Sequence, residues 1–105
     1  MGLFTVTPRP TFRAPVKLTV PGEETPAEID VTFAHLPREA FRAWLERAWK
    51  QHDLETMREI VRDWSGVDEP YSEANLQLLL DNYPAASQEL LEAYCKALTE
   101  SRAKN

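Results

Sequence analysis

The chain has 105 residues, of which 43% are apolar and 28% charged, values close to those of a soluble globular protein. The length leaves no room for a second core of comparable size, and the composition argues against a disordered chain or a fibrous repeat. The formal net charge of −5 argues against nonspecific binding to nucleic acid, because it repels the phosphate backbone.

The chain begins with a proline-containing segment that has no apolar period, so we expect an extended arm over residues 1–11. Apolar residues then alternate with polar ones over residues 16–20 and again over residues 29–33, the period of two that is typical of half-buried strands. The connection, residues 21–26, has turn-forming residues at both ends and is too short for a helical crossover. The sequence therefore predicts an antiparallel β-hairpin over residues 12–35.

The apolar period becomes helical after Pro37. Asp53 and Ser72 are typical N-cap residues, and Pro84 cannot continue a helix, so these three positions divide the rest of the chain. A two-stranded hairpin is marginal in water, so the helices must cover its apolar face. We predict one α+β domain over residues 12–105, mostly helical, in which four short helices pack on the N-terminal hairpin. The helices are expected over about residues 37–50, 53–64, 72–82 and 84–101.

Side chains able to perform chemistry are few. His35 lies at a predicted strand end, His52 lies in a polar connection, and the single cysteine, Cys95, lies at the edge of an apolar helix face. None has a sequence neighbour that completes a catalytic set, and no Cys/His spacing is typical of a zinc site. The glycines are too scattered for a phosphate-binding loop. We therefore expect no catalytic residue, no cofactor and no metal ion.

Signals for secretion and membrane insertion are also missing from the sequence. The first residues lack the basic and apolar regions of a signal peptide. The longest run of leucines, residues 78–80, is far shorter than the roughly 20 apolar residues of a membrane span. A lone cysteine cannot form an intramolecular disulfide and is typical of a reducing compartment. We expect an intracellular protein that binds neither a membrane nor nucleic acid.

Apolar and aromatic side chains exceed what the predicted core requires. Leu78 lies on the opposite side of its helix from Leu76 and Leu80, and Trp49 lies on the flank of the first apolar helix face. Both Leu78 and Trp49 could complete the core or contact a partner. Surplus apolar surface on a small acidic protein indicates protein binding.

Two aromatic residues, Trp64 and Tyr71, bracket the acidic segment of residues 66–70. One interpretation is that both rings pin this loop to the core, so that the carboxylates of Asp68 and Glu69 face solvent. The other is that the rings contact a partner directly. The carboxylates lack the spacing of a calcium loop, so the segment does not predict a metal site.

An acidic turn, a capped helix and a Tyr-Pro break follow one another in residues 64–86. The sequence there reads Trp64…Val67-Asp68-Glu69-Pro70-Tyr71-Ser72…Asn75-Leu76…Leu79-Leu80-Asp81-Asn82-Tyr83-Pro84-Ala85-Ala86, and it continues with Glu92-Ala93-Tyr94, Leu98-Thr99 and the ending at residues 102–105. This succession resembles the tail assembly chaperones of long-tailed bacteriophages and their prophages. Residues 12–22 are similar, more weakly, to the start of the hairpin in such proteins.

The resemblance implies a non-catalytic protein that is made early in tail morphogenesis. Such a protein binds the tape measure protein, keeps its apolar helices from aggregating and brings tail tube subunits to it. It acts in the cytoplasm of the bacterial host and is absent from the mature virion.

A tape measure protein is largely a long amphipathic helix, and a small helical protein can bind such a helix in an apolar groove rimmed by charge. We expect this groove between the third and fourth helices. The expected partner-binding residues are the anchors Leu78, Tyr83 and Trp64, the rim charges Asp68, Glu69 and Asp81, and the aromatic residues Tyr71 and Trp49.

Two other functions are compatible with the same residues. The first is a structural subunit of the tail or of the head–tail connector, in which the arm of residues 1–11 would become ordered between neighbours. The second is an acidic inhibitor that imitates nucleic acid. Self-association is also open, because an exposed hairpin edge can pair with another strand.

Overall fold

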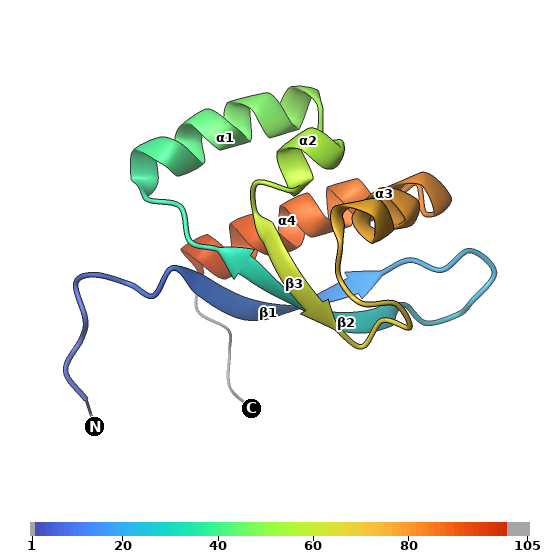
Figure 1. Cartoon of the computed structure of the whole chain (residues 1–105), viewed down its shortest axis with the longest axis horizontal. Coiled ribbons are helices and arrows are strands. Elements are labelled where there is room, and N and C mark those ends of the chain that lie inside the picture. Colours follow the sequence, from blue (N-terminus) through green and yellow to red (C-terminus); the bar gives the residue numbers. More distant parts are fainter. Residues whose placement is uncertain (1, 101–105) are drawn as a thin grey trace.

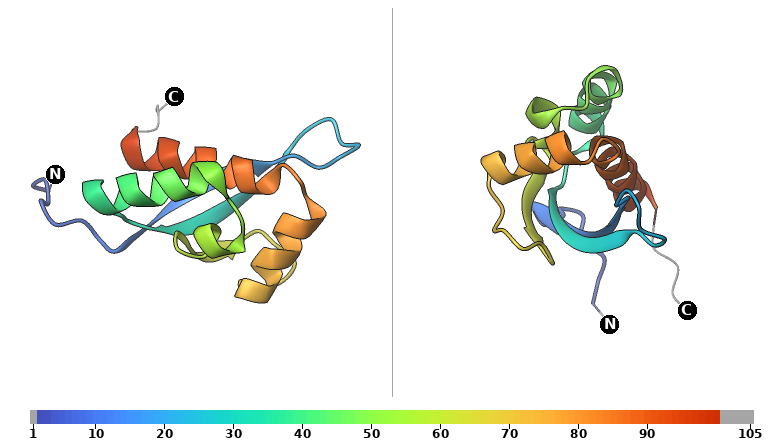
Figure 2. Two further views of the ribbon diagram at one scale, coloured as in Figure 1. Left: turned by 90° about the horizontal axis from the view of Figure 1, so that it is seen from above. Right: turned by 90° about the vertical axis from the view of Figure 1, so that its right-hand side faces the viewer.

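The structure is a computed structural model, and it describes residues 2–100. Its elements follow the chain in the order β1 (Thr11–Leu18), β2 (Ala27–Ala34), α1 (Arg38–Lys50), α2 (Leu54–Met57), β3 (Val61–Ser65), α3 (Glu73–Asn82) and α4 (Ala86–Thr99). The strands form one antiparallel sheet in the order β1-β2-β3. All four helices lie on one side of this curved sheet (Figures 1 and 2). The fold is therefore α+β, with its core between the sheet and the helices.

The sheet has one apolar face and one polar face, which explains why helices cover only one side. On β1 and β2 the apolar residues that alternate with polar ones point toward the helices. They include Val16, Ile29, Val31 and Phe33, all of which are buried. On the opposite face Arg13 and Asp30 form an exposed ion pair at 3.7 Å. An alternation of this kind fixes the register, since a shift of one residue would turn every apolar side chain outward.

An aromatic cluster joins α1 and α4 to the sheet. The Tyr94 ring of α4 lies 5.1 Å from Phe33 and 5.2 Å from Trp44, measured between ring centroids. The Tyr94 hydroxyl donates to the Ala34 carbonyl at 2.8 Å, and the Trp44 indole donates to the Thr56 carbonyl at 2.9 Å. Burial raises the pKa of Tyr94, so the hydroxyl remains a donor. The buried polar atoms of this cluster are thus satisfied.

The expected fold is wrong in three respects. The two N-terminal strands do not stand alone as a hairpin, because β3 extends the sheet to three strands. Residues 2–100 are 41% helical and 21% strand rather than mostly helical. The helix expected over residues 53–64 does not form. Instead α2 ends at Met57 after a single turn, and β3 begins at Val61.

A β-bulge explains why the period of β3 resembles that of a helix. Val61 lies opposite Phe33, but Trp64 lies opposite Val31, so one extra residue is inserted between them at the register shift. Cross-strand partners share a face of the sheet, and the bulge therefore turns two side chains three residues apart toward the same side. Residues on the same face are typically three or four apart in a helix, whereas in an unbulged strand they are two or four apart.

The remaining expected segments differ by one or two residues from the structure. α1 and α3 each begin one residue after the expected start, and α4 begins at Ala86 because the Tyr83 carbonyl accepts from the Ala86 amide in the turn around Pro84. Residues 2–10 hold no helix or strand. Residue 1 of the expected arm, residue 101 of the expected last helix and residues 102–105 of the resemblance lie outside the described residues.

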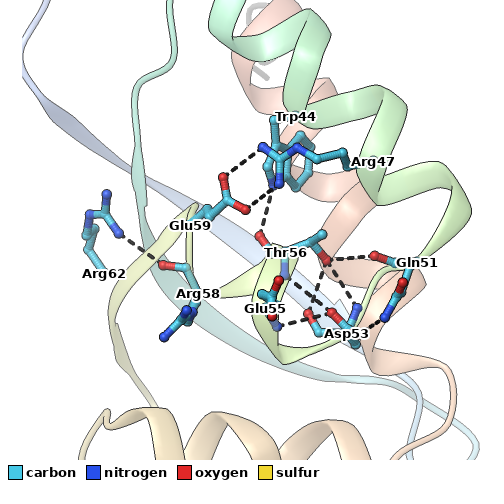
Figure 3. A network of polar contacts seen from close by, with 9 residues as sticks. All are labelled: Trp44, Arg47, Gln51, Asp53, Glu55, Thr56, Arg58, Glu59 and Arg62. Atoms are coloured by element: carbon cyan, nitrogen blue, oxygen red, sulfur yellow. Dashed lines mark hydrogen bonds and ion pairs between the residues drawn. The ribbon is translucent and has the colours of Figure 1, made fainter.

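α2 is fixed at its start by a capping box (Figure 3). The Asp53 carboxylate accepts from the amides of Glu55 at 3.1 Å and Thr56 at 3.4 Å, and Thr56 Oγ1 accepts from the Asp53 amide at 3.1 Å. The Gln51 side chain donates to the same carboxylate at 2.6 Å. The hydrogen bond from Gln51 is the largest cause of a lowered pKa of Asp53, and the hydrogen bonds from the backbone amides lower it further.

Replacing Asp53 with alanine should lower the free energy of unfolding by about 1 kcal/mol at neutral pH, the usual effect of losing an N-cap. Because the pKa of Asp53 is lower in the folded than in the unfolded state, its carboxylate stabilises the fold above the unfolded-state pKa. This stabilisation is lost as the pH falls through the folded-state pKa. Urea unfolding of both proteins should show a difference that shrinks on acidification. A difference that is unchanged in acid would contradict this role of the carboxylate.

Candidate protein-binding groove

The described part of the chain carries an open groove of about 420 Å³ between α3 and the end of the sheet where β1 and β2 are joined. We call it the α3–sheet groove. Its lining comes from the end of β1 and the following residues, from β2, from β3, from the β3–α3 loop and from α3: Leu18, Val20, Ala27, Ile29, Trp64, Gly66, Val67, Asp68, Glu69, Asn75, Leu78, Leu79, Asn82 and Tyr83. The floor is apolar, and the two carboxylates lie on the loop.

The β3–α3 loop is held by the two aromatic side chains that bracket it. The Trp64 indole donates to the Glu69 carbonyl at 2.8 Å. The Trp64 and Tyr71 rings pack edge to face, with 5.2 Å between their centroids. The Tyr71 hydroxyl donates to the Val61 carbonyl at 3.1 Å, and burial raises the pKa of Tyr71. Gly66, with φ +85°, supplies the left-handed turn that starts the loop. The rings therefore pin the loop, and Asp68 is exposed.

α3 presents apolar side chains on two faces. Leu76 is fully buried in the core, whereas Leu78 is 54% exposed and lines the groove. Ser72 caps the helix by accepting from the Asn75 amide at 3.0 Å, and Asn75 in turn donates from its side chain to the Pro70 carbonyl at 2.8 Å. The cap thus ties the helix to the acidic loop. This connection fixes the distance between Leu78 and the carboxylates at the rim.

The structure brings together five of the eight residues that the sequence singled out. Trp64, Asp68, Glu69, Leu78 and Tyr83 all line the α3–sheet groove. The other three do not line it: Tyr71 supports the Trp64 ring, Asp81 accepts from the Gln77 side chain at 2.8 Å, and Trp49 lies on α1 with 57% of its surface exposed.

The position of the groove differs from the expected one. No residue of α4 lines it, so it does not lie between the third and fourth helices. Its second wall comes from Leu18, Ala27 and Ile29 of the sheet and from Val20 just after β1. Of these, Leu18, Val20 and Ile29 were expected to face the helices as part of the hairpin core. One sequence feature indicates this wall: the apolar alternation of β1 continues past the end of the strand to Val20.

The side chains with reactive chemistry lie outside the groove. His52 hydrogen-bonds through Nδ1 to the Ser87 hydroxyl at 2.8 Å, and His35 packs edge to face on Phe12. Burial raises the pKa of Cys95, which disfavours the thiolate. Among residues 2–100, no three His, Cys, Asp or Glu side chains gather closely enough to hold a metal ion. The arrangement of the groove fits binding of another chain through apolar contacts and charge at the rim.

Comparison with known proteins gives a match over the whole chain. Residues 1–105 match a protein-family model described as phage tail assembly chaperone. This match confirms the resemblance seen in residues 64–86, and it also includes residues 23–63, on which that resemblance did not rest. No curated protein and no solved structure matches the chain. Within the part of the chain that the structure describes, no helix combines the length and apolar character needed to cross a bilayer.

Proposed function

The chain belongs to the phage tail assembly chaperone family, and we propose that it performs this role by binding the tape measure protein and bringing tail tube subunits to it. In this proposal the α3–sheet groove receives the apolar face of a tape measure helix. The protein acts without catalysis, in the host cytoplasm, and leaves before the particle is complete.

The single observation that supports this mechanism is the exposure of Leu78 beside an apolar groove. An amphipathic helix binds such a groove through side chains spaced three and four residues apart, and a few central apolar anchors supply most of the binding free energy. Leu78, Tyr83 and Trp64 are the proposed anchors. Asp68 and Glu69 carry the rim charge and would orient a helix whose apolar face is flanked by lysine or arginine.

Two partners require two surfaces. Trp49 is the only large aromatic side chain of the folded elements, residues 11–99, that is more than half exposed, and it lies on α1 away from the groove lining. We assign Trp49 to the second partner, the tail tube protein. A tube subunit bound at α1 would then lie on the same chaperone molecule as the tape measure helix in the groove.

Co-expression tests the proposed role directly. The tape measure protein produced alone should aggregate, and co-expression with this chain should move it into the soluble fraction, from which both should co-purify. Tail tube subunits should join this complex. Purified phage particles, analysed by mass spectrometry, should lack the chain. A chain that leaves the tape measure protein insoluble, or that is present in finished particles at the stoichiometry of a subunit, would contradict the proposal and favour a structural role.

A further inference from the structure

Three large apolar side chains lie on the segment that precedes the sheet. Residues 2–10 carry Leu3, Phe4 and Val6, whose exposed fractions are 96%, 90% and 87%. No other large apolar side chain of residues 2–100 is exposed as fully. Apolar surface gathered in one short segment is typical of a site that a partner covers. This segment, residues 2–10, is called the arm below.

The arm is directed away from the groove of its own chain. The Pro10 carbonyl accepts from the His35 amide at 2.9 Å, which fixes the base of the arm beside the end of β2. Pro8 and Pro10 hold their own φ angles and restrict Thr7 and Arg9 to extended conformations. Figure 1 shows the arm leaving the sheet at the end opposite the β1–β2 connection. The groove lies at the other end, beside Leu18 and Ala27.

The length of the arm also disfavours binding within one chain. Phe4 precedes Thr11 by seven residues, and Leu18 follows Thr11 by seven residues. Each stretch spans about 23 Å at about 3.3 Å per residue. Phe4 could reach the Leu18 end of its own groove only if the arm reversed at its prolines and lay fully stretched along β1. The groove of another molecule imposes no such constraint.

We propose that the arm of one copy binds in the α3–sheet groove of a second copy. The chemistry of the two surfaces is complementary: Leu3, Phe4 and Val6 match the apolar floor, and Arg9 matches Asp68 and Glu69. Residues 2–10 contain no acidic residue, and the lining of the groove contains no basic one. The contact joins different surfaces of the two copies, so repeating it generates open chains or closed rings.

This inference goes beyond the proposed function and has a consequence for it. In the absence of a partner, each groove would be covered by the arm of a neighbour, so that apolar surface is not left exposed. A partner helix that enters the groove must then displace the arm. The self-associated form would be the storage state of the chaperone, and partner binding would dissociate it.

Complementation between two variants tests the proposal. One variant lacks residues 2–7 and keeps the groove, and the other carries Leu78→Ala and keeps the arm. The deletion ends before Pro10, so it spares the bond from His35. By sedimentation velocity the wild type should form larger species as its concentration rises, while each variant alone should remain monomeric. Mixed in equal amounts, the two variants should form a dimer and nothing larger.

A labelled peptide with the sequence of residues 2–10 provides a second readout. It should bind the arm-deleted protein, more weakly at high salt because of Arg9, and Leu78→Ala in the same background should weaken binding at least tenfold. Arg42→Ala, a control at an exposed position of α1 outside the groove and outside the proposed partner sites, should leave association of the full chain unchanged. A wild type that stays monomeric, or variants that fail to complement although circular dichroism shows both folded, would overturn the proposal. Binding of the arm-deleted chain to the tape measure protein tests the proposed function separately.

Discussion

The Leu78→Ala variant is expected to bind a helical fragment of the tape measure protein about 30-fold more weakly than the wild type, which corresponds to about 2 kcal/mol. The side chain is 54% exposed and lines the α3–sheet groove, so a bound helix would bury a surface that the free protein leaves in water. For the same reason its truncation should change the melting temperature little. Isothermal titration calorimetry gives the affinity, and thermal unfolding gives the stability.

Trp49→Ala is the matched control for this experiment, because Trp49 is equally exposed at 57% but lies on α1. It should retain the affinity for the tape measure fragment, and under the proposal it should weaken binding of the tail tube protein. If Leu78→Ala lowers the melting temperature and the affinity together, Leu78 serves the core and the proposed anchor is wrong. If Trp49→Ala alone reduces the affinity, the helix binds at α1.

The Trp44→Ala variant is expected to lose about 3–5 kcal/mol of unfolding free energy, the usual effect of truncating a fully buried aromatic side chain. Trp44 is 1% exposed and packs against Tyr94, and its indole satisfies the Thr56 carbonyl at 2.9 Å. Truncation would leave a cavity between α1 and α4 and an unpaired carbonyl. Domains of this size have total stabilities of about 5–15 kcal/mol, so the variant should unfold at a much lower urea concentration.

The same helix supplies the control for this second prediction. Trp49→Ala removes an identical side chain from an exposed position of α1, and it should change the unfolding free energy by less than about 1 kcal/mol. Equal losses in the two variants would mean that α1 does not pack through Trp44. Trp44→Phe should fall between wild type and Trp44→Ala, because it keeps most of the apolar contact and loses the hydrogen bond.

Local sequence patterns predicted those helices and strands whose apolar period and caps arise within the element itself. The alternation at Val16 and Ile29, and the caps at Asp53 and Ser72, correspond to features of the structure. β3 could not be predicted, because its strand character depends on pairing with β2 and its spacing of Val61 and Trp64 depends on a bulge. Tertiary pairing overrode the local period in this segment.

The candidate site was predictable on one side only. The position of Leu78 opposite Leu76 on its helix, and the two rings around an acidic loop, indicated one wall of the groove. The opposite wall includes Leu18 and Ile29, which the sequence pattern assigns to the core. Only the continuation of the apolar alternation to Val20 indicates that this wall extends beyond the core. Only the position of α3 relative to the end of the sheet, set by the β3–α3 loop, makes Leu18 and Ile29 part of the site.

The three tryptophan indoles offer the most direct measurement of the central proposal, that the α3–sheet groove binds the tape measure protein. Trp44 reports on the core, Trp49 on the surface of α1, and Trp64, whose indole donates to the Glu69 carbonyl, on the groove. Their ¹⁵N–¹H signals can be assigned with single Trp→Phe variants and followed while a tape measure fragment is added. The account predicts that the Trp64 signal shifts with saturation while those of Trp49 and Trp44 stay in place. A shift of the Trp49 signal with an unchanged Trp64 signal would contradict it.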